Sequence, residues 1–296
     1  MHPQLSDEQL RFYNDNGYLV LSAEEHNLVA NPAELKVWAE QVRNWPLEKG
    51  KWMPYFEVTG SGARQQMRTE NFVDYHKEWS QLIHGDGLGS ILKQLSGEVR
   101  HSAPGNFGQG HKLTLQQDML LFKDKINYKL PNGNGFHAHV DYHAYSHIGE
   151  IAHLTANVAV DEANVANGCL EVVPGSHKTD IEFSNGGRIS QGWEDSHEWT
   201  KVPLKQGDIL LFGSHLAHRS KSNTTDKSRT SLYATFYMAK DGDNLRKTYY
   251  EHRRKVFPPD HEREEGNDYQ QGWKTYGFAA PFSSVDSEKQ EGVAAM

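Results

Sequence analysis

The stretch Asn167-Gly168-Cys169-Leu170-Glu171-Val172-Val173-Pro174-Gly175 places a short, largely apolar run between two turn signals. Asn-Gly is typical of the tight turn of a β-hairpin, and Pro-Gly turns the chain again. A run of five residues between such turns suits a buried strand and is too short for most helices. The stretch therefore predicts β-structure built from short strands and tight turns, with a hairpin at Asn167-Gly168.

Similar short runs recur on both sides of this stretch, from about Gln116 to Lys240. The expected strands are 119–122, 126–128, 137–141, 155–160, 169–173, 209–212 and 230–238. Eight or so short strands after a helical start indicate a double-stranded β-helix, the jelly roll found in cupins. We therefore expect a mainly β protein with flanking helices around a cupin-like core.

Helices are expected in the N-terminal part of the chain. Ser6 and Gln9 form a capping box, and Gly17 is placed to end that helix before the short strand 18–21. A second helix begins near Pro32, and a third helical region spans about 77–95. We expect a single catalytic domain over 1–296, with a mostly helical part (1–115), a jelly-roll core (116–240) and a C-terminal extension (241–296) that ends in disorder.

Composition excludes several classes of protein. The chain has 296 residues and a formal charge of -8, which argues against a general binder of nucleic acid or anionic membranes. No stretch approaches the 18 or so apolar residues of a membrane span. The only cysteine, Cys169, excludes an intramolecular disulfide and favours a cytoplasmic location. We expect a small-molecule substrate as partner, and the sequence predicts no oligomeric state.

The segment His139-Val140-Asp141 carries the strongest chemical signal. Residues two apart on a strand point to the same face, so an imidazole and a carboxylate can reach one metal ion. His218, a few residues beyond the run 209–212, would complete a 2-His-1-carboxylate site. The local spacing leaves rivals open: His137 and His143 for the first pair, and His215 for the third ligand.

A second signal lies eleven residues after His218. Arg229 stands at the start of the last long strand, where a buried guanidinium suits bidentate capture of a carboxylate. The order of His-x-Asp, a distal His and then Arg is much more specific than any of its parts.

On these residues the chain resembles the phytanoyl-CoA dioxygenase-like branch of the Fe(II)/2-oxoglutarate oxygenases, from Leu5 to about Tyr269. The matching strings are Gly17-Tyr18-Leu19-Val20, Lys129-Leu130-Pro131, His139-Val140-Asp141, the stretch 167–177, Gly207-Asp208-Ile209-Leu210-Leu211-Phe212, and His218-Arg219-Ser220 with Asn223 and Arg229. Family members commonly have glutamine where this chain has Val140.

The resemblance implies a set of roles for individual residues. His139, Asp141 and His218 would bind Fe(II), and Arg229 would bind the distal carboxylate of 2-oxoglutarate, with O2 as the other cosubstrate. The further candidates for the 2-oxoglutarate pocket are Ser220, Ser231, Lys129 and Asn157. The implied activity is oxidation, typically hydroxylation, of a substrate C–H bond with release of succinate and CO2.

The substrate is less well defined by the sequence. Candidates for contact with it are Arg68, in a segment expected between helices, and Tyr142, His143 and Tyr145 after the metal strand. Residues 122–131 look similar to bacterial 2-aminoethylphosphonate hydroxylases, which favours a small or medium polar substrate. Two alternatives are a non-catalytic cupin-like protein that binds 2-oxoglutarate or another metabolite, and a Zn(II) hydrolase on the same three ligands.

Overall fold

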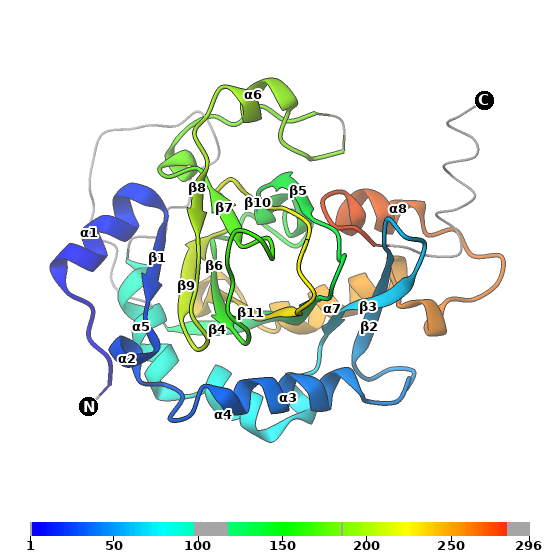
Figure 1. Cartoon of the computed structure of the whole chain (residues 1–296), viewed down its shortest axis with the longest axis horizontal. Coiled ribbons are helices and arrows are strands. Elements are labelled where there is room, and N and C mark those ends of the chain that lie inside the picture. The colour runs from blue at the N-terminus through cyan, green and yellow to red at the C-terminus, as the bar shows by residue number, and fades with distance from the viewer. Residues whose placement is uncertain (1, 98–117, 185, 283–296) are drawn as a thin grey trace.

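Two antiparallel β-sheets form the centre of the protein (Figure 1). The computed structural model describes residues 2–97, 118–184 and 186–282. The larger sheet has the strand order β1-β9-β6-β11-β4-β3-β2 and the smaller one β5-β10-β7-β8. The larger sheet consists of β1 (Tyr18–Leu21), β2 (Met53–Val58), β3 (Arg64–Glu70), β4 (Met119–Lys129), β6 (His153–Ala159), β9 (Ile209–Gly213) and β11 (Arg229–Met238). The smaller sheet consists of β5 (Phe136–His139), β7 (Leu170–Val172), β8 (Thr200–Val202) and β10 (His218–Ser220).

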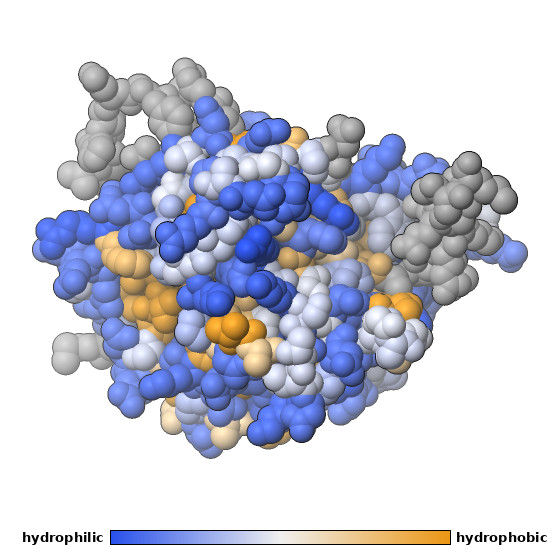
Figure 2. All heavy atoms as spheres, turned by 45° about the horizontal axis from the view of Figure 1, so that its top comes forward, coloured by the Kyte–Doolittle hydropathy of each residue, from blue (hydrophilic) through white to orange (hydrophobic). Residues whose placement is uncertain are grey.

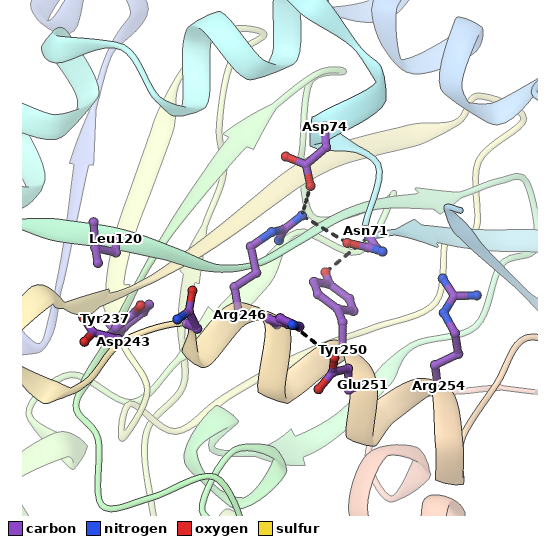
Figure 3. Close-up of a pocket in the computed structure, with 11 residues that line it drawn as sticks. Asn71, Asp74, Leu120, Tyr237, Asp243, Arg246, Tyr250, Glu251 and Arg254 are labelled. Carbon is purple, nitrogen blue, oxygen red and sulfur yellow. Dashed lines mark hydrogen bonds and ion pairs between the residues drawn. The ribbon is translucent and has the colours of Figure 1, made fainter. Parts of the chain in front are cut away.

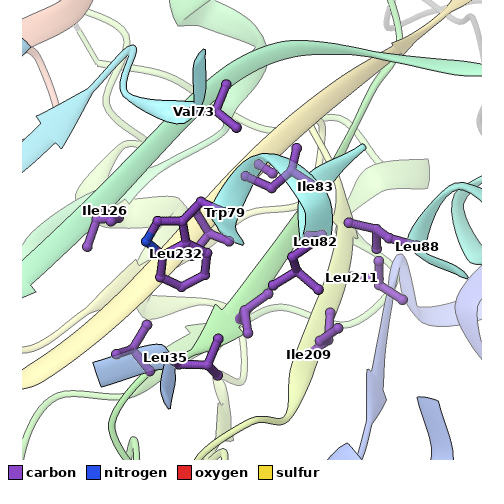
Figure 4. Close-up of a cluster of buried hydrophobic side chains, with 14 of the residues drawn as sticks. Leu35, Val73, Trp79, Leu82, Ile83, Leu88, Ile126, Ile209, Leu211 and Leu232 are labelled. Atoms are coloured by element: carbon purple, nitrogen blue, oxygen red, sulfur yellow. The ribbon is translucent and has the colours of Figure 1, made fainter. Parts of the chain in front are cut away.

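Helices from the N-terminal part cover the outer face of the larger sheet (Figure 1). Trp79 and Ile83 of α4 pack in one apolar cluster with Ile126 of β4 and Leu232 of β11 (Figure 4). The helices are α1 (Asp7–Asn16), α2 (Ala23–His26), α3 (Ala33–Arg43), α4 (Lys77–Ile83), α5 (Asp86–Ser96), α6 (Gln191–Asp195), α7 (Leu245–Val256) and α8 (Gln270–Gly272). The apolar cluster around Trp79 therefore marks the face of the larger sheet that the helices cover. The opposite face of that sheet is turned toward the smaller sheet.

The inner face of the larger sheet, which is turned toward the smaller sheet, has two different halves. Successive residues of a strand point to opposite faces, so Leu232 and Ala234 face the helices while Arg229, Ser231 and Tyr233 face inward. Tyr233 packs with Phe212 and with Val172 of the smaller sheet. The rest of the inner face carries buried charged residues such as Arg68, Glu70 and Lys123 beside a third apolar cluster that includes Tyr55 and Phe122. Buried charges of this kind are unusual.

Several predictions from the sequence are confirmed. The two sheets form the expected jelly roll, and Ser6 and Gln9 make the capping box of α1. Gly17 ends α1 in the left-handed conformation with φ 80°. The helix expected to begin near Pro32 is α3, which starts at Ala33. The helical region expected over about 77–95 consists of α4 and α5, which are separated at Gly85. The disordered end predicted for the chain lies outside the described residues, and the division into domain parts stays a prediction.

Other expectations are wrong. The segment around Arg68 is not simply a link between helices, because Arg64–Glu70 is strand β3 of the larger sheet. The two runs 119–122 and 126–128 form one strand of eleven residues, β4. The metal strand was expected over 137–141 but ends at His139, and Asp141 begins the 3-10 turn η2 (Asp141–Ala144).

The hairpin expected at Asn167-Gly168 is also absent. Strand β6 before this turn belongs to the larger sheet, and β7 after it belongs to the smaller one. Gly168 has φ 73°, as a tight turn requires, and Asn167 accepts a hydrogen bond from the Asn164 amide. The turn therefore carries the chain from one sheet to the other.

The surface of the molecule is mostly hydrophilic in the view of Figure 2, with smaller apolar patches between the charged side chains. Within the described ranges, every helix is too short or too polar to cross a lipid bilayer.

Candidate active site

The smaller sheet brings two of the predicted ligands together. His139 at the end of β5 and His218 at the start of β10 are paired across the two antiparallel strands. Their ring centroids lie 4.2 Å apart, and both side chains are buried. The two histidines are separated by 78 positions in the sequence, and the pairing of β5 with β10 brings them together. The backbone hydrogen bonds of this strand pair hold the two rings on one face of the smaller sheet.

Asp141 reaches the same point from the turn that follows β5. Its Oδ1 lies 3.8 Å from Nε2 of His139. One ligand atom from each of His139, Asp141 and His218 lies within 4.8 Å of the others, and all three residues are buried. Two imidazoles and one carboxylate at this separation suit a divalent metal ion bound on one face, as in the non-haem Fe(II) oxygenases.

The backbone orients both imidazole rings. Nδ1 of His139 lies 2.6 Å from the carbonyl of His137, and Nδ1 of His218 lies 2.9 Å from the carbonyl of Leu216. Donation from Nδ1–H to these carbonyls leaves the Nε2 lone pairs directed at the metal position. Outer hydrogen bonds of this kind are what a metal-ligating histidine requires, so the residues fit the ion.

Electrostatics keep the three groups in the protonation states that bind metals. Burial lowers the pKa of His139 to about 3 and also lowers the pKa of His218, so both rings are neutral near pH 7. Burial alone would raise the pKa of Asp141, but nearby His218 and Lys125 hold it at about 2. The carboxylate is therefore charged.

The rival histidines point elsewhere. His137 contributes its backbone carbonyl to His139. The ring of His143 lies 4.2 Å from the ring of Phe183, and the ring of His215 stacks on Tyr142 at 4.5 Å. The choice among these histidines follows from the pairing of β5 with β10, which local spacing does not reveal.

Two buried cations lie side by side at the ends of β4 and β11. Lys129 is paired with Arg229 across the two strands, and both side chains are buried. Nζ of Lys129 donates to the Ser220 hydroxyl at 2.8 Å and to the Gly168 carbonyl at 3.3 Å. Nη1 of Arg229 donates to the same carbonyl at 2.5 Å. Burial and the charge of Arg229 lower the pKa of Lys129 well below its usual range.

This pair has no acidic partner within 4.0 Å among the described residues, and Nε of Arg229 is buried without a hydrogen bond. Two cations that lack a counter-ion are unfavourable in a buried place unless an anion joins them. Ser220 already contacts the pair, while Ser231 lies two residues after Arg229 on the same inner face. A carboxylate-binding position is the chemistry that this arrangement supports.

Asn157 lies on the inner face of β6 opposite Tyr233, and its buried amide Nδ2 has no hydrogen-bond partner in the part of the chain that the structure describes. A buried donor without a partner calls for a ligand or a water molecule. Asn157 thus belongs to the polar part of the inner face, and its place in the wall of a 2-oxoglutarate pocket stays a prediction.

The four predicted substrate residues are not gathered in one place. Arg68 is buried in β3 and donates to Asn127 and Glu70. Tyr145 is buried among Phe122, His153 and Tyr249 in an aromatic cluster. The hydroxyl of Tyr142 donates to Glu150 at 2.6 Å, and His143 is half-buried against Phe183. Arg68 therefore contributes to the polar inner face, whereas the Tyr145 side chain serves the core.

Sequence reasoning missed a charged cluster formed by Glu70, Lys123 and Lys125 of that inner face together with Arg253 of helix α7. One signal could have found two of them. Lys123, Lys125, Asn127 and Lys129 alternate with apolar or outward residues along β4, so they share one face of a single strand.

A cavity of about 680 Å³ near α7 is separate from these residues (Figure 3). Arg246 occupies it and already contacts Asp124, Asp74 and Asn71. The guanidinium of Arg246 is therefore already paired with polar groups of the protein.

Known proteins resemble the chain over most of its length. The model of the phytanoyl-CoA dioxygenase family matches residues 13–231. A dioxygenase, lolE1, of Epichloe uncinata is 36% identical over 259 residues, covering 88% of this chain and 93% of that protein. The 2-aminoethylphosphonate dioxygenase of an uncultured bacterium is 32% identical over 278 residues, with coverage of 93% and 98%. The methylphosphonate hydroxylase of Gimesia maris is 35% identical over 258 residues, with coverage of 87% and 90%.

Solved structures support the fold independently. EctD from S. alaskensis, solved with 2-oxoglutarate and 5-hydroxyectoine, has a TM-score of 0.61 at 20% identity over 81% of this chain and 78% of its own. The carbocyclase SnoK has a TM-score of 0.54 at 21% identity over 80% and 85%. The relatives favour a dioxygenase over the binding protein and the zinc hydrolase considered above. The chain belongs to the phytanoyl-CoA dioxygenase family and is an Fe(II)/2-oxoglutarate-dependent dioxygenase.

Proposed function

We propose that this enzyme hydroxylates a C–H bond of a small polar substrate, with His139, Asp141 and His218 as the iron ligands. The observation that carries the proposal is the convergence of these three buried side chains within 4.8 Å. When bound, Fe(II) supplies with O2 and 2-oxoglutarate the oxidising power that yields succinate, CO2 and the oxidised product. The protein holds the reactants and keeps water out.

We assign the distal carboxylate of 2-oxoglutarate to the cation pair of Arg229 and Lys129. Within the described residues, Nε of Arg229 has no hydrogen-bond partner, and Ser220 lies beside Lys129 as a further donor. A carboxylate here would neutralise two buried cations and gain charge-assisted hydrogen bonds. Ser231 and Asn157 lie on the same inner face and complete the proposed pocket wall.

The size and polarity of the substrate follow from the relatives and from the inner face. Two of the similar proteins are named for methylphosphonate and for 2-aminoethylphosphonate, which are small compounds with an anionic phosphonate group. The polar residues of β3 and β4 suit such compounds better than a long acyl chain. The proposal also includes a cytoplasmic location, which rests on the single cysteine, and no nucleic-acid or membrane partner.

A turnover assay tests this function. The full chain, reconstituted with Fe(II) under argon, is mixed with 2-oxoglutarate, air-saturated buffer and a panel of small phosphonates, carboxylates and amines. We expect at least one compound to raise succinate release above the background without substrate, with a product heavier by one oxygen atom. Succinate release that no compound raises, with only long acyl-CoA thioesters active, would contradict the proposed substrate range.

A further inference from the structure

Four basic side chains surround a single carboxylate on the inner face of the larger sheet. Glu70 of β3 is fully buried and pairs with Arg253 of α7 at 2.6 Å. Arg68 lies 3.1 Å from the same carboxylate, and Lys123 lies 3.7 Å from it. The fourth cation is Lys125, which follows on the same face of β4. Glu70 can neutralise only one of these charges, so the cluster carries excess positive charge.

Lys125 differs from the other members of the cluster in its contacts. It is paired in register with Glu70 on β3 and with Tyr233 on β11, and its Nζ lies 4.7 Å from the centre of the Tyr233 ring. Among the described residues, no hydrogen bond or ion pair reaches its ammonium group. The side chain is surrounded by protein but stays partly accessible. A cation in such a place gains much from an anion.

Lys125 lies toward the three predicted metal ligands. Tyr233, beneath its ammonium group, packs in one cluster with Phe212, and the ring of Phe212 lies 5.1 Å from that of His218. The charges of Lys125 and Asp141 stabilise one another. A divalent ion bound by Asp141 would take over that interaction and add positive charge. The binding of an anion near Lys125 would therefore become more favourable when a metal ion occupies the site.

The position differs from the one assigned to the distal carboxylate of 2-oxoglutarate. Lys125 and Lys129 are four residues apart on an extended strand, a separation of about 13 Å along the backbone. A carboxylate held by Lys129 and Arg229 is therefore too far from Lys125 to be its counter-ion.

We propose that Lys125 binds a terminal oxyanion of the substrate, a phosphonate or a carboxylate, and so determines which carbon is presented to the metal. The proposal rests on the proposed function above. A substrate anchored at this point has the carbon next to its anionic group closest to the three ligands, so oxidation occurs near the anion. A small anionic substrate is thus preferred over a neutral one of the same size.

Binding measurements on the full chain test this role. The anaerobic protein is loaded with Fe(II) and 2-oxoglutarate, and calorimetry measures the affinity for methylphosphonate, 2-aminoethylphosphonate, β-alanine and ethanolamine. The variants are Lys125→Gln, Lys125→Arg and the control Lys240→Gln, whose lysine is exposed. We expect Lys125→Gln to weaken binding of the anionic probes by about tenfold or more. Lys125→Arg should recover most of the loss, and Lys240→Gln should match the wild type.

The probes also separate the two sources of the anion. A preference for the two phosphonates over β-alanine identifies a phosphonate, and the reverse preference identifies a carboxylate. One comparison uses the wild-type protein alone, so it does not depend on the folding of a variant. Dimethyl methylphosphonate, the neutral ester, should bind more weakly than methylphosphonate by a factor of about ten or more.

Three results would overturn the proposal. The first is anionic probes that bind wild type and Lys125→Gln equally well. The second is a Lys125→Gln variant that loses affinity for 2-oxoglutarate but not for the anionic probes, which would place Lys125 in the cosubstrate pocket. The third is a wild-type protein that binds Fe(II) and 2-oxoglutarate but none of the anionic probes. In all three the proposed function stands, whereas a wild type that binds neither Fe(II) nor 2-oxoglutarate would refute that function itself.

Discussion

His139 and His218 face each other across the paired strands β5 and β10, and in each ring Nδ1 is hydrogen-bonded to the carbonyl two residues earlier. The same local geometry is thus used twice, on two neighbouring strands. Because both rings are fixed by backbone groups, their Nε2 atoms converge before any metal arrives. A preorganised pair of this kind binds a metal ion with little loss of side-chain freedom.

Removal of a ligand should abolish iron binding without unfolding the protein. We expect His218→Ala and Asp141→Ala to lose more affinity for Fe(II) than the roughly 10–100-fold typical of removing an outer hydrogen-bond partner. The control is His215→Ala, because His215 stacks on Tyr142 and lies close in sequence to His218. Iron content after anaerobic reconstitution measures the effect. A His218→Ala protein that retains one iron per chain would show that the ligand set is wrong.

Removal of the guanidinium should affect the cosubstrate and spare the metal. We expect Arg229→Leu to raise the dissociation constant for 2-oxoglutarate by about tenfold or more, since a charge-assisted bidentate contact is lost. Its affinity for Fe(II) should stay close to that of the wild type. Arg64→Gln is the matched control, because Arg64 is exposed and pairs with Asp260. Equal affinity of wild type and Arg229→Leu for 2-oxoglutarate would refute the role of this residue.

The turn at Gly168 supports the same pocket through its backbone. Its carbonyl accepts from both Lys129 and Arg229, and a Cβ at this position would lie 2.1 Å from the carbonyl oxygen of Lys221. Gly62 is a matched control, with φ 81° against 73° but open space around it. We expect Gly62→Ala to cost about 1 kcal/mol of unfolding free energy and Gly168→Ala clearly more.

Gly168→Ala should also weaken binding of 2-oxoglutarate, which Gly62→Ala should not. Urea unfolding gives the stability of each variant, and titration with 2-oxoglutarate gives its affinity. Two variants with the same loss of stability and the same affinity would mean that the close approach of Gly168 to Lys221 has no consequence.

Glu70 should make the stability of the protein depend on pH in the acid range. Burial would raise its pKa, but Arg253, Lys123 and Arg68 hold it at about 2, below the usual 4.5. A carboxylate whose pKa is lowered by folding contributes its stability above pH 4.5 and loses it as the pH falls toward 2. The contribution is roughly 3 kcal/mol in this buried setting.

We therefore expect Glu70→Gln to remove this part of the pH dependence. At neutral pH the variant should lose about 3–5 kcal/mol of unfolding free energy, because Arg253 and Arg68 are left without their carboxylate. Glu251→Gln, at an exposed position on the same helix as Arg253, should change stability by less than about 0.5 kcal/mol. Denaturant unfolding between pH 2 and 7 tests both variants, and an unchanged slope in Glu70→Gln would contradict the assignment.

The sequence alone predicted the jelly roll because its strands are short, apolar and bounded by strong turn residues. It could not predict β3, whose residues Arg64–Glu70 are mostly polar although its second half is buried. The reason is that this strand turns its polar side chains toward the charged interior, where Glu70 and Arg68 pair with one another and with Arg253. Hydrophobic alternation, on which strand prediction depends, is lost in such a strand.

For the site, the sequence order was sufficient to select His139, Asp141 and His218, which the structure brings within 4.8 Å of one another, while the role of Arg229 stays a prediction. The selection among neighbouring histidines depends on the pairing of β5 with β10, which joins residues far apart in the chain. Asp141 lies in the turn η2 rather than on a strand, so the same-face argument does not by itself explain why Asp141 lies beside His139 and His218. Lys125 was missed because a lysine on a predicted strand is usually solvated.

The most direct test of the account is the visible spectrum of the anaerobic protein with Fe(II) and 2-oxoglutarate. We predict a weak charge-transfer band in the wild type that is lost in Asp141→Ala, followed after admission of oxygen by succinate formation from the wild type only. A wild-type protein that gives neither the band nor succinate, or an Asp141→Ala protein that gives both, would contradict the proposal that these three side chains hold the iron.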